Sequence, residues 1–331
     1  MHPKAQKVTV WGWYPAFEKI ADHYNENHTD LQVCWNNGGQ GGAEYTHFQN
    51  TIKAGKGAPD VIQLEYEAMP QFLAGQKKYL VDLGKFGMNK HKADYTSGAW
   101  NSVTFGGSDS VYAVPVDTGP FVMYVNEDVF EKYGLKVPTT WDEFEQTGRQ
   151  LKEKGYDGKL TNWQSDGTAV NIALFSQKNV KVYEYSANDP TKVGVDFDQK
   201  GVKEVLSYWQ RLAKDGLIDI ADQSSTDTMK KFGAGQYATY VQASWFMGYY
   251  VKGAFKTPES SPFKIYAAPK WDDAPPDVNP GGSAFAVTYQ AKDTEASAKV
   301  ARELYGDDFS RNSGVTDGGL FPSWTQTLAS S

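Results

Sequence analysis

The chain has 331 residues, which exceeds the usual size of one domain and predicts two lobes, each with its own core. The net charge is -7 at pH 7, and acidic and basic residues are interspersed, which argues against a nucleic-acid-binding protein. No apolar run approaches the roughly 18 residues that cross a bilayer, and residues 1–6 lack the apolar core of a signal peptide. We therefore expect no membrane span and no nucleic-acid partner, and an export signal would belong to a precursor.

The sequence predicts no metal, cofactor or disulfide. Cys34 lies in an alternating, strand-like run, and we interpret it as structural. Asp196 and Asp198 resemble the start of a calcium loop, but Ser207 stands where the bidentate glutamate would be. The glycines of residues 38–42 have neither the lysine of a phosphate-binding loop nor the dinucleotide-binding spacing. Zinc spacing is missing around the histidines considered, which are His23, His28, His47 and His91.

The first part of the chain alternates strands with helices. Strands are expected over residues 7–11, 31–35 and 60–64, where apolar residues alternate or run together. Helices are expected over residues 17–24 and 45–54, where apolar residues recur three and four positions apart. This β-α-β-α-β order predicts a parallel, doubly wound α/β lobe.

The later segments continue the alternation. Thr140 is followed three residues later by Glu143, a capping box that predicts a helix from Trp141 to about Lys154. Helical spacing of apolar residues predicts a second amphipathic helix over residues 200–215. The remaining expected elements are strands over residues 111–116, 121–125, 237–241 and 263–268 and a helix over residues 296–305.

The aromatic content gives the first functional indication. Aromatic residues make up 14% of the chain, with 10 Trp and 20 Tyr, more flat amphipathic surface than a core usually needs. A carbohydrate site needs such rings for stacking and planar polar groups for hydrogen bonds, and open α/β sheets place ligands beyond the carboxyl ends of strands. Trp13 and Tyr14 follow the first expected strand and are therefore candidate ligand contacts, whereas Trp11 is expected to pack in the core.

Further candidates follow other strands. Glu65 and Tyr66 come directly after the third expected strand, and Glu67 beside them is interpreted as solvated surface. Asn37 lies in the glycine-rich loop after the second strand and is a weaker candidate. The Gly281-Gly282-Ser283 segment would let backbone amides approach hydroxyl groups closely, although a plain turn also explains it.

Several short motifs occur in order over most of the chain, namely residues 8–11, 57–61, 112–117, 123–126, 138–144, 235–238, 244–245 and 281–283. With them the chain resembles the family 1 extracellular solute-binding proteins of ABC importers, which include the maltose- and oligosaccharide-binding proteins. The resemblance implies a two-lobed periplasmic-binding-protein-like α/β fold, with a ligand cleft between lobes joined by crossing segments. It also implies a binding protein without enzymatic activity or cofactor, which takes up a neutral oligosaccharide.

The resemblance extends to domains, partners and location. It implies a discontinuous N-terminal lobe, residues 1–114 and 265–318, and a C-terminal lobe, residues 115–264 and 319–331, which lacks the family's final helices. A hinge near Pro115 and Phe263 would close the lobes. The expected protein is a monomer that delivers its sugar to permease subunits. It would act in the periplasm or as a lipoprotein anchored to the outer face of the cytoplasmic membrane.

Four more candidate contacts depend on the resemblance. Asp117 follows the first crossing between lobes, where it would contact ligand or fix the hinge. Trp163 stands where the family often has a sugar contact in the second lobe. Trp245 is the preferred stacking residue, with Phe246 beside it; for Trp245, packing in the core is the alternative.

Two other functions remain open from the sequence. A glycoside hydrolase needs two facing carboxylates, and Glu65 and Asp117 are candidates, but no spacing pairs them. A receptor for a charged solute such as a polyol phosphate would need an arginine clamp, yet Arg149, Arg211 and Arg302 lie in helical stretches away from strand ends. Binding of a neutral sugar is therefore the preferred function.

Overall fold

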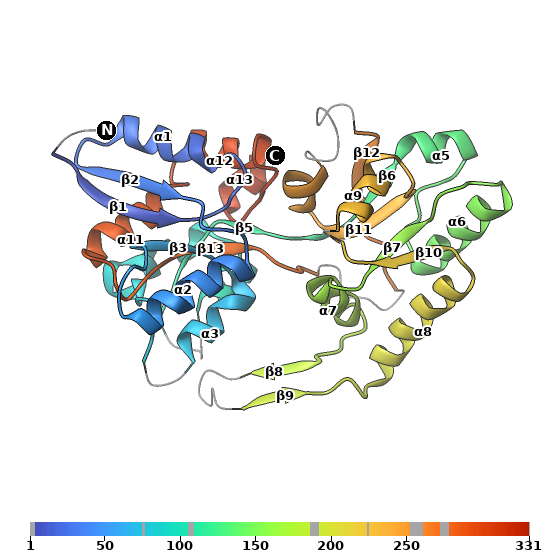
Figure 1. Ribbon diagram of the computed structural model, residues 1–331, viewed down its shortest axis with the longest axis horizontal. Coiled ribbons are helices and arrows are strands. Elements are labelled where there is room, and N and C mark those ends of the chain that lie inside the picture. The colour runs from blue at the N-terminus through green and yellow to red at the C-terminus, as the bar shows by residue number, and fades with distance from the viewer. Residues whose placement is uncertain are drawn as a thin grey trace. The chain divides into compact units, whose positions relative to one another are not determined.

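The computed structural model describes residues 4–74, 77–104, 109–185, 192–223, 225–251, 261–271 and 278–330 (Figure 1). The chain forms two compact units. Unit 1 comprises Met1–Thr118, Tyr185–Val193 and Gly281–Ser331, and unit 2 comprises Gly119–Glu184 and Gly194–Pro280. None of the helices in the described segments combines the length and the apolar character that spanning a bilayer requires.

A five-stranded sheet forms the centre of unit 1. Its order is β2-β1-β3-β13-β4, with bounds Leu31–Asn36, Gln6–Trp11, Val61–Glu65, Ser283–Val287 and Val114–Pro115. Strand β1 pairs in parallel with β2 and β3, which confirms the parallel arrangement predicted for the first part of the chain. Strand β13 pairs antiparallel with both β3 and β4, so a late segment completes the sheet.

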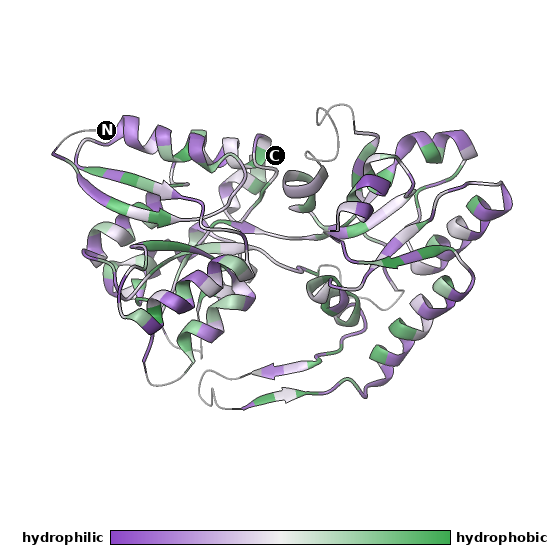
Figure 2. Ribbon diagram, viewed as in Figure 1, coloured by the Kyte–Doolittle hydropathy of each residue, from purple (hydrophilic) through white to green (hydrophobic). Residues whose placement is uncertain are grey.

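Helices cover this sheet. The helix α1 (Phe17–Asn27) buries Phe17, Ile20, Ala21 and Tyr24, the residues whose spacing predicted it. Figure 2 shows apolar residues along the strands and polar residues on the outward helix faces. The other elements of unit 1 are α2 (Gly42–Ala54), η1 (Tyr66–Ala68), α3 (Met69–Leu73), η2 (Leu83–Phe86), η3 (Met88–Asp94), α4 (Ser97–Val103), β5 (Asp117–Thr118), α11 (Thr294–Glu303), α12 (Asp308–Thr316), β14 (Phe321–Pro322) and α13 (Thr325–Ser330).

Unit 2 contains two small sheets. One has the antiparallel order β11-β6-β12, with bounds Thr239–Ala243, Phe121–Asn126 and Phe263–Ala267. The other pairs β10 (Ile218–Ala221) in parallel with β7 (Thr161–Gln164). The helical segments are α5 (Glu127–Tyr133), α6 (Trp141–Glu153), α7 (Thr168–Ser176), α8 (Lys200–Lys214), α9 (Thr226–Gly233) and the π-helical η4 (Met247–Val251). A further two-stranded sheet, formed by β8 (Tyr183–Tyr185) and β9 (Val193–Val195), has residues assigned to both units.

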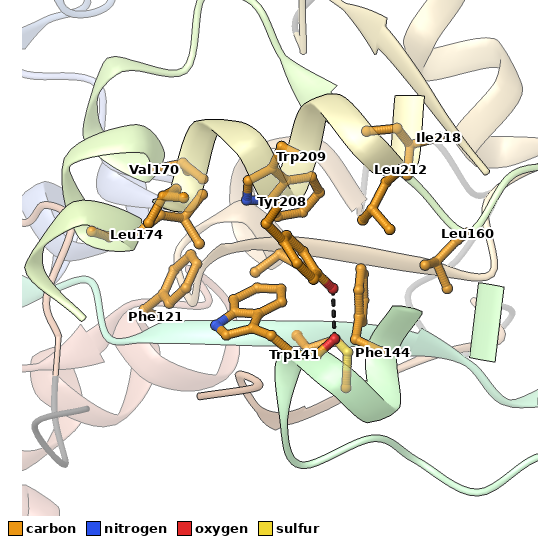
Figure 3. Close-up of a cluster of buried hydrophobic side chains, with 14 of the residues drawn as sticks. Phe121, Trp141, Phe144, Leu160, Val170, Leu174, Tyr208, Trp209, Leu212 and Ile218 are labelled. Carbon is orange, nitrogen blue, oxygen red and sulfur yellow. Dashed lines mark hydrogen bonds between the residues drawn. The ribbon is translucent and has the colours of Figure 1, made fainter. Parts of the chain in front are cut away.

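An aromatic core joins α6 to α8 in unit 2 (Figure 3). The Thr140 hydroxyl accepts from the Glu143 amide, and the Glu143 carboxylate accepts from the Thr140 amide, both at 3.2 Å. This confirms the predicted capping box, and it fixes Trp141 at the start of α6. Trp141 is fully buried against Trp209, with ring centroids 5.6 Å apart, and the Tyr208 hydroxyl donates to the Trp141 carbonyl at 2.6 Å.

The two units divide the chain differently from the sequence-based boundaries. Residues 265–280 belong to unit 2, because β12 pairs with β6. Residues 319–331 belong to unit 1, because β14 pairs with β5. Residues 115–118 also stay in unit 1, since Pro115 pairs with Ala284 of β13. Strand pairing between segments distant in sequence, which local patterns do not reveal, sets these boundaries.

Candidate functional site

Buried polar side chains meet in unit 1 where β3 ends and β13 begins. The Asp117 carboxylate accepts from the Ser283 amide and from the Ser283 hydroxyl, both at 2.9 Å. The same hydroxyl is hydrogen-bonded to the Tyr14 hydroxyl at 2.9 Å, and the Gln63 amide nitrogen donates to it at 3.3 Å. Two candidates from the sequence, Asp117 and Ser283, therefore form one hydrogen-bonded pair.

The environment of this cluster raises the pKa of Asp117. Burial raises the pKa of Asp117 to about 7, and the charge of Glu65 adds to the effect, while the two hydrogen bonds from Ser283 oppose it. Asp117 is only 2% exposed. The Asp117 side chain is thus hydrogen-bonded inside unit 1. This fits a role in fixing the backbone near the crossing better than direct contact with ligand.

Glu65 lies at the end of β3 and is half-buried. The Tyr45 hydroxyl of α2 donates to its carboxylate at 2.7 Å, and the Glu65 amide donates to the same hydroxyl at 3.1 Å. Desolvation raises the pKa of Glu65, and the hydrogen bond from Tyr45 opposes that shift. Because Glu65 is partly exposed, it remains a candidate to bind a sugar hydroxyl. Glu67, interpreted as solvated surface, is exposed.

Tyr66 and Gly282 hold the ends of these strands together. The Tyr66 hydroxyl donates to the Asp117 carbonyl at 2.9 Å, and the Tyr66 amide donates to the Gly282 carbonyl at 3.1 Å. Gly282 has φ 115°, and a Cβ there would lie 2.6 Å from the Asp117 carbonyl oxygen. Gly282 is therefore required by close packing and backbone geometry, and Tyr66 is buried in the same junction.

The aromatic residues after β1 lie differently from the expectation. Trp13 is buried edge-on against Tyr45, with ring centroids 5.9 Å apart. Tyr14 is buried against Phe285 of β13, at 5.3 Å, whereas Trp11 is only half-buried. Trp11 was expected in the core and Trp13 and Tyr14 at the ligand, but the structure buries Trp13 and Tyr14 and leaves Trp11 half-buried. Tyr14 is therefore a core residue, because residues from distant parts of the chain pack against it. Asn37 is exposed, as a loop contact would be, and its side-chain oxygen accepts from the Gly39 amide at 3.0 Å.

Trp245 is a half-buried stacking candidate in unit 2. It follows β11 and lies two residues before the π-helical segment η4, a type of turn that is frequent at functional sites. The rings of Tyr249 and Tyr250 in η4 lie 6.0 and 6.5 Å from its ring. Trp245 thus belongs to an aromatic surface that the sequence analysis recognised only in part, although the neighbouring tyrosines were a visible signal.

Of the two other aromatic candidates in unit 2, Phe246 is buried and Trp163 is half-buried. Phe246 is fully buried and stacks on Tyr240 and Tyr250, with centroids 5.0 and 4.9 Å apart. The expectation of a ligand contact therefore does not fit Phe246, because its ring is fully buried and belongs to a core cluster against which Trp245 also packs. Trp163 lies 5.0 Å from Trp209 of α8, which gives its ring a packing role.

Polar residues after β7 and β10 were missed by the sequence analysis. The Gln242 side-chain nitrogen donates to the Gln164 oxygen at 2.9 Å, and the Gln223 amide donates to the Asp166 carboxylate at 2.8 Å. Desolvation raises the pKa of Asp166, and the neighbouring Asp222 adds to this. The rule applied to Glu65, a polar residue directly after a strand, would have identified Gln164, Asp166 and Asp222.

Charged groups elsewhere form ion pairs. Arg149 and Arg211 both contact Glu145, at 2.6 and 2.7 Å, and Arg302 contacts Glu303 at 3.4 Å. Arg311, which the sequence argument left out, pairs with Asp308 at 2.8 Å. In the part of the chain that the structure describes, no three His, Cys, Asp or Glu side chains come together as a metal site requires.

Comparison with known proteins places this chain among binding proteins. A family model described as bacterial extracellular solute-binding protein matches residues 12–308. An arabinooligosaccharide-binding protein of Halalkalibacterium halodurans is 23% identical over 76% of this chain and 57% of the relative, so the chain spans little more than half of that protein. A lactose-binding protein of Rhizobium radiobacter is 24% identical over 92% of this chain and 71% of the relative.

A solved structure is also similar. The ABC-transporter-associated binding protein of B. animalis subsp. lactis Bl-04, in complex with β-1,6-galactobiose, is 27% identical with a TM-score of 0.83. The likeness covers 98% of this chain and 77% of that protein. It confirms the fold class that the sequence predicted.

Proposed function

Because this chain belongs to the bacterial extracellular solute-binding proteins, we propose that it captures a neutral oligosaccharide outside the cytoplasm and delivers it to the permease of an ABC importer. The observation that carries the proposal is Trp245, a half-buried ring at the end of a strand beside two tyrosines. Such a ring can stack on the apolar C–H face of a sugar, while strand-end carboxylates and amides bind hydroxyl groups.

The ligand class follows from the relatives and from the charges. The three similar proteins described above are named for, or solved with, arabino-oligosaccharides, lactose and β-1,6-galactobiose, which are uncharged. Arginine side chains are paired with carboxylates of this chain, namely those of Arg149, Arg211, Arg302 and Arg311. These arginines therefore do not form a clamp for an anionic solute. A neutral sugar therefore suits this chain better than a polyol phosphate.

Binding without catalysis is part of the proposal. The family consists of solute-binding proteins. Asp117 and Glu65, the carboxylates considered for a hydrolase, are engaged with Ser283 and Tyr45 respectively. A glycosidase instead needs two carboxyl groups facing the scissile bond.

The hinge motion, the monomeric state and the lipid anchor expected from the sequence remain parts of this proposal. In the described division, the chain passes between the units at four points, none of them at Phe263: Thr118–Gly119, Glu184–Tyr185, Val193–Gly194 and Pro280–Gly281. Small-angle scattering with and without sugar tests the motion, because closure reduces the radius of gyration. An unchanged radius at saturating sugar would contradict a hinge.

Titration calorimetry against lactose, β-1,6-galactobiose, arabinotriose and glycerol 3-phosphate tests the ligand class. We expect at least one of the three sugars to bind, and Trp245→Ala to weaken it about tenfold or more, a loss of about 1.4 kcal/mol. Trp209→Phe is the matched control, because Trp209 is buried in the core of unit 2. Binding of only glycerol 3-phosphate, release of shortened sugar, or unchanged affinity in Trp245→Ala would each contradict the proposal.

A further inference from the structure

Gly119 lies where the pyrrole edge of Trp245 comes closest to the backbone in unit 2. A Cβ atom at position 119 would lie 2.8 Å from Trp245 Cδ1 and 2.9 Å from Trp245 Nε1. It would also lie 3.2 Å from the Cβ of Ala243. Ordinary carbon contacts need about 3.5–4.0 Å. The Trp245 ring therefore occupies the space that any side chain at position 119 would need.

Backbone geometry does not by itself demand glycine here. Gly119 does not have a positive φ, whereas Gly282 and eleven other glycines of the described segments do. Alanine could therefore adopt the backbone conformation of position 119. What favours glycine at this position is the room it leaves for Trp245.

Both segments that meet at this contact are fixed by hydrogen bonds. The Gly119 amide donates to the Asn279 side chain at 2.6 Å, and the Phe121 amide donates to the Val278 carbonyl at 2.9 Å. The Ser244 amide, next to Trp245, donates to the Pro120 carbonyl at 2.9 Å. Since neither backbone can move away freely, a methyl group at position 119 must displace the ring.

We propose that Gly119 is a positioning residue that sets the place and tilt of the Trp245 ring for stacking on a sugar. The inference rests on the proposed function. Tyr249 also packs edge-on against the Trp245 ring, with ring centroids 6.0 Å apart. A shift of about 1 Å, enough to restore ordinary contact distances, would spoil the parallel contact that sugar stacking needs.

A double-mutant cycle tests the effect on binding. Calorimetry with β-1,6-galactobiose and lactose compares wild type, Gly119→Ala, Trp245→Ala and the double variant. For the sugar that wild type binds, we expect Gly119→Ala to lower the affinity at least fivefold. In the Trp245→Ala background, the same substitution should change the affinity less than twofold. Gly98→Ala is the matched control, because a Cβ there meets nothing within 4 Å. Equal losses from Gly119→Ala in both backgrounds would overturn the inference.

A second measurement needs no sugar. In protein labelled with 5-fluorotryptophan, the ¹⁹F resonance of Trp245 is assigned by its loss in Trp245→Phe. We expect Gly119→Ala to move this resonance and Gly98→Ala to leave it in place. If the resonance does not move in Gly119→Ala, the inference fails and the proposed function stands. The same holds if Gly119→Ala binds sugar normally while Trp245→Ala has lost affinity. If wild type binds no sugar, the proposed function fails, and the binding role of Gly119 fails with it.

Discussion

Ser283 donates two hydrogen bonds to the carboxylate of Asp117, one from its amide and one from its hydroxyl, both at 2.9 Å. We expect Ser283→Ala to lower the free energy of unfolding by about 1–3 kcal/mol, because a buried carboxylate loses a partner. Urea denaturation at pH 7 measures this. Ser207→Ala, on the exposed face of α8, is the control and should stay close to wild type. Equal midpoints for the two variants would contradict the role given to Ser283.

Gly282→Ala tests the junction between Tyr66, Asp117 and β13. The new methyl group would meet the Asp117 carbonyl at 2.6 Å, and alanine at φ 115° is strained. We expect a loss of about 3 kcal/mol or more, or failure to fold. Gly42→Ala is the control, since its Cβ meets nothing within 4 Å. A Gly282→Ala protein with wild-type thermal stability would refute the close packing.

Glu44 is fully buried in α2, and neither of its carboxyl oxygens has a hydrogen-bond partner. Desolvation raises its pKa from 4.5 to about 8, opposed by the backbone of Gly38. Between these two values the native state binds more protons than the unfolded state, so stability falls as pH rises. The contribution of Glu44 to the free energy of unfolding is fully present below about pH 4.5 and is lost as the pH rises through about 8.

We therefore expect Glu44→Gln to flatten the pH dependence of unfolding between pH 5.5 and 8. The slope should decrease by about 1 kcal/mol per pH unit or less, since a single titrating group contributes at most about 1.4. Urea midpoints measured at four pH values give the slope. Glu26→Gln, on an exposed position of α1, should keep the wild-type slope. A Glu44→Gln slope that matches wild type would show that Glu44 titrates normally.

Tyr208→Phe tests the core of unit 2. It removes the hydroxyl that donates to the Trp141 carbonyl at 2.6 Å and leaves the ring contacts in place. We expect a loss of about 1 kcal/mol in the free energy of unfolding. Tyr183→Phe, whose side chain is exposed, should have little effect. If the two variants lose equal stability, the buried hydrogen bond contributes nothing.

Local signals made much of the fold predictable. The capping box of Thr140 and Glu143 located the start of α6, because both partners lie within one helical turn. The position of β13 between β3 and β4 was not predictable, since the pairing joins residues far apart in sequence. Each local pattern is compatible with several sheet orders, and only tertiary packing selects one.

The candidate site divides in the same way. Trp245, which follows a strand, was chosen through the family resemblance, and it is half-buried in the structure. Tyr14 stands in an equivalent place, but Phe285 and Tyr305 cover its ring. Whether a strand-end aromatic residue faces solvent depends on what later segments place over it. Spacing along the chain does not carry that information.

The late arrival of β13 bears on how the protein folds during synthesis. Unit 1 begins the chain, yet Ser283–Val287 must be inserted between two strands made much earlier. While residues 119–280 are being synthesised, β3 and β4 lack the strand that pairs with both of them, β13. An unpaired strand edge is prone to wrong pairing. Unit 2 is nearly continuous in sequence and can fold on the ribosome first. The segment at the start of the chain would then be the last to become native.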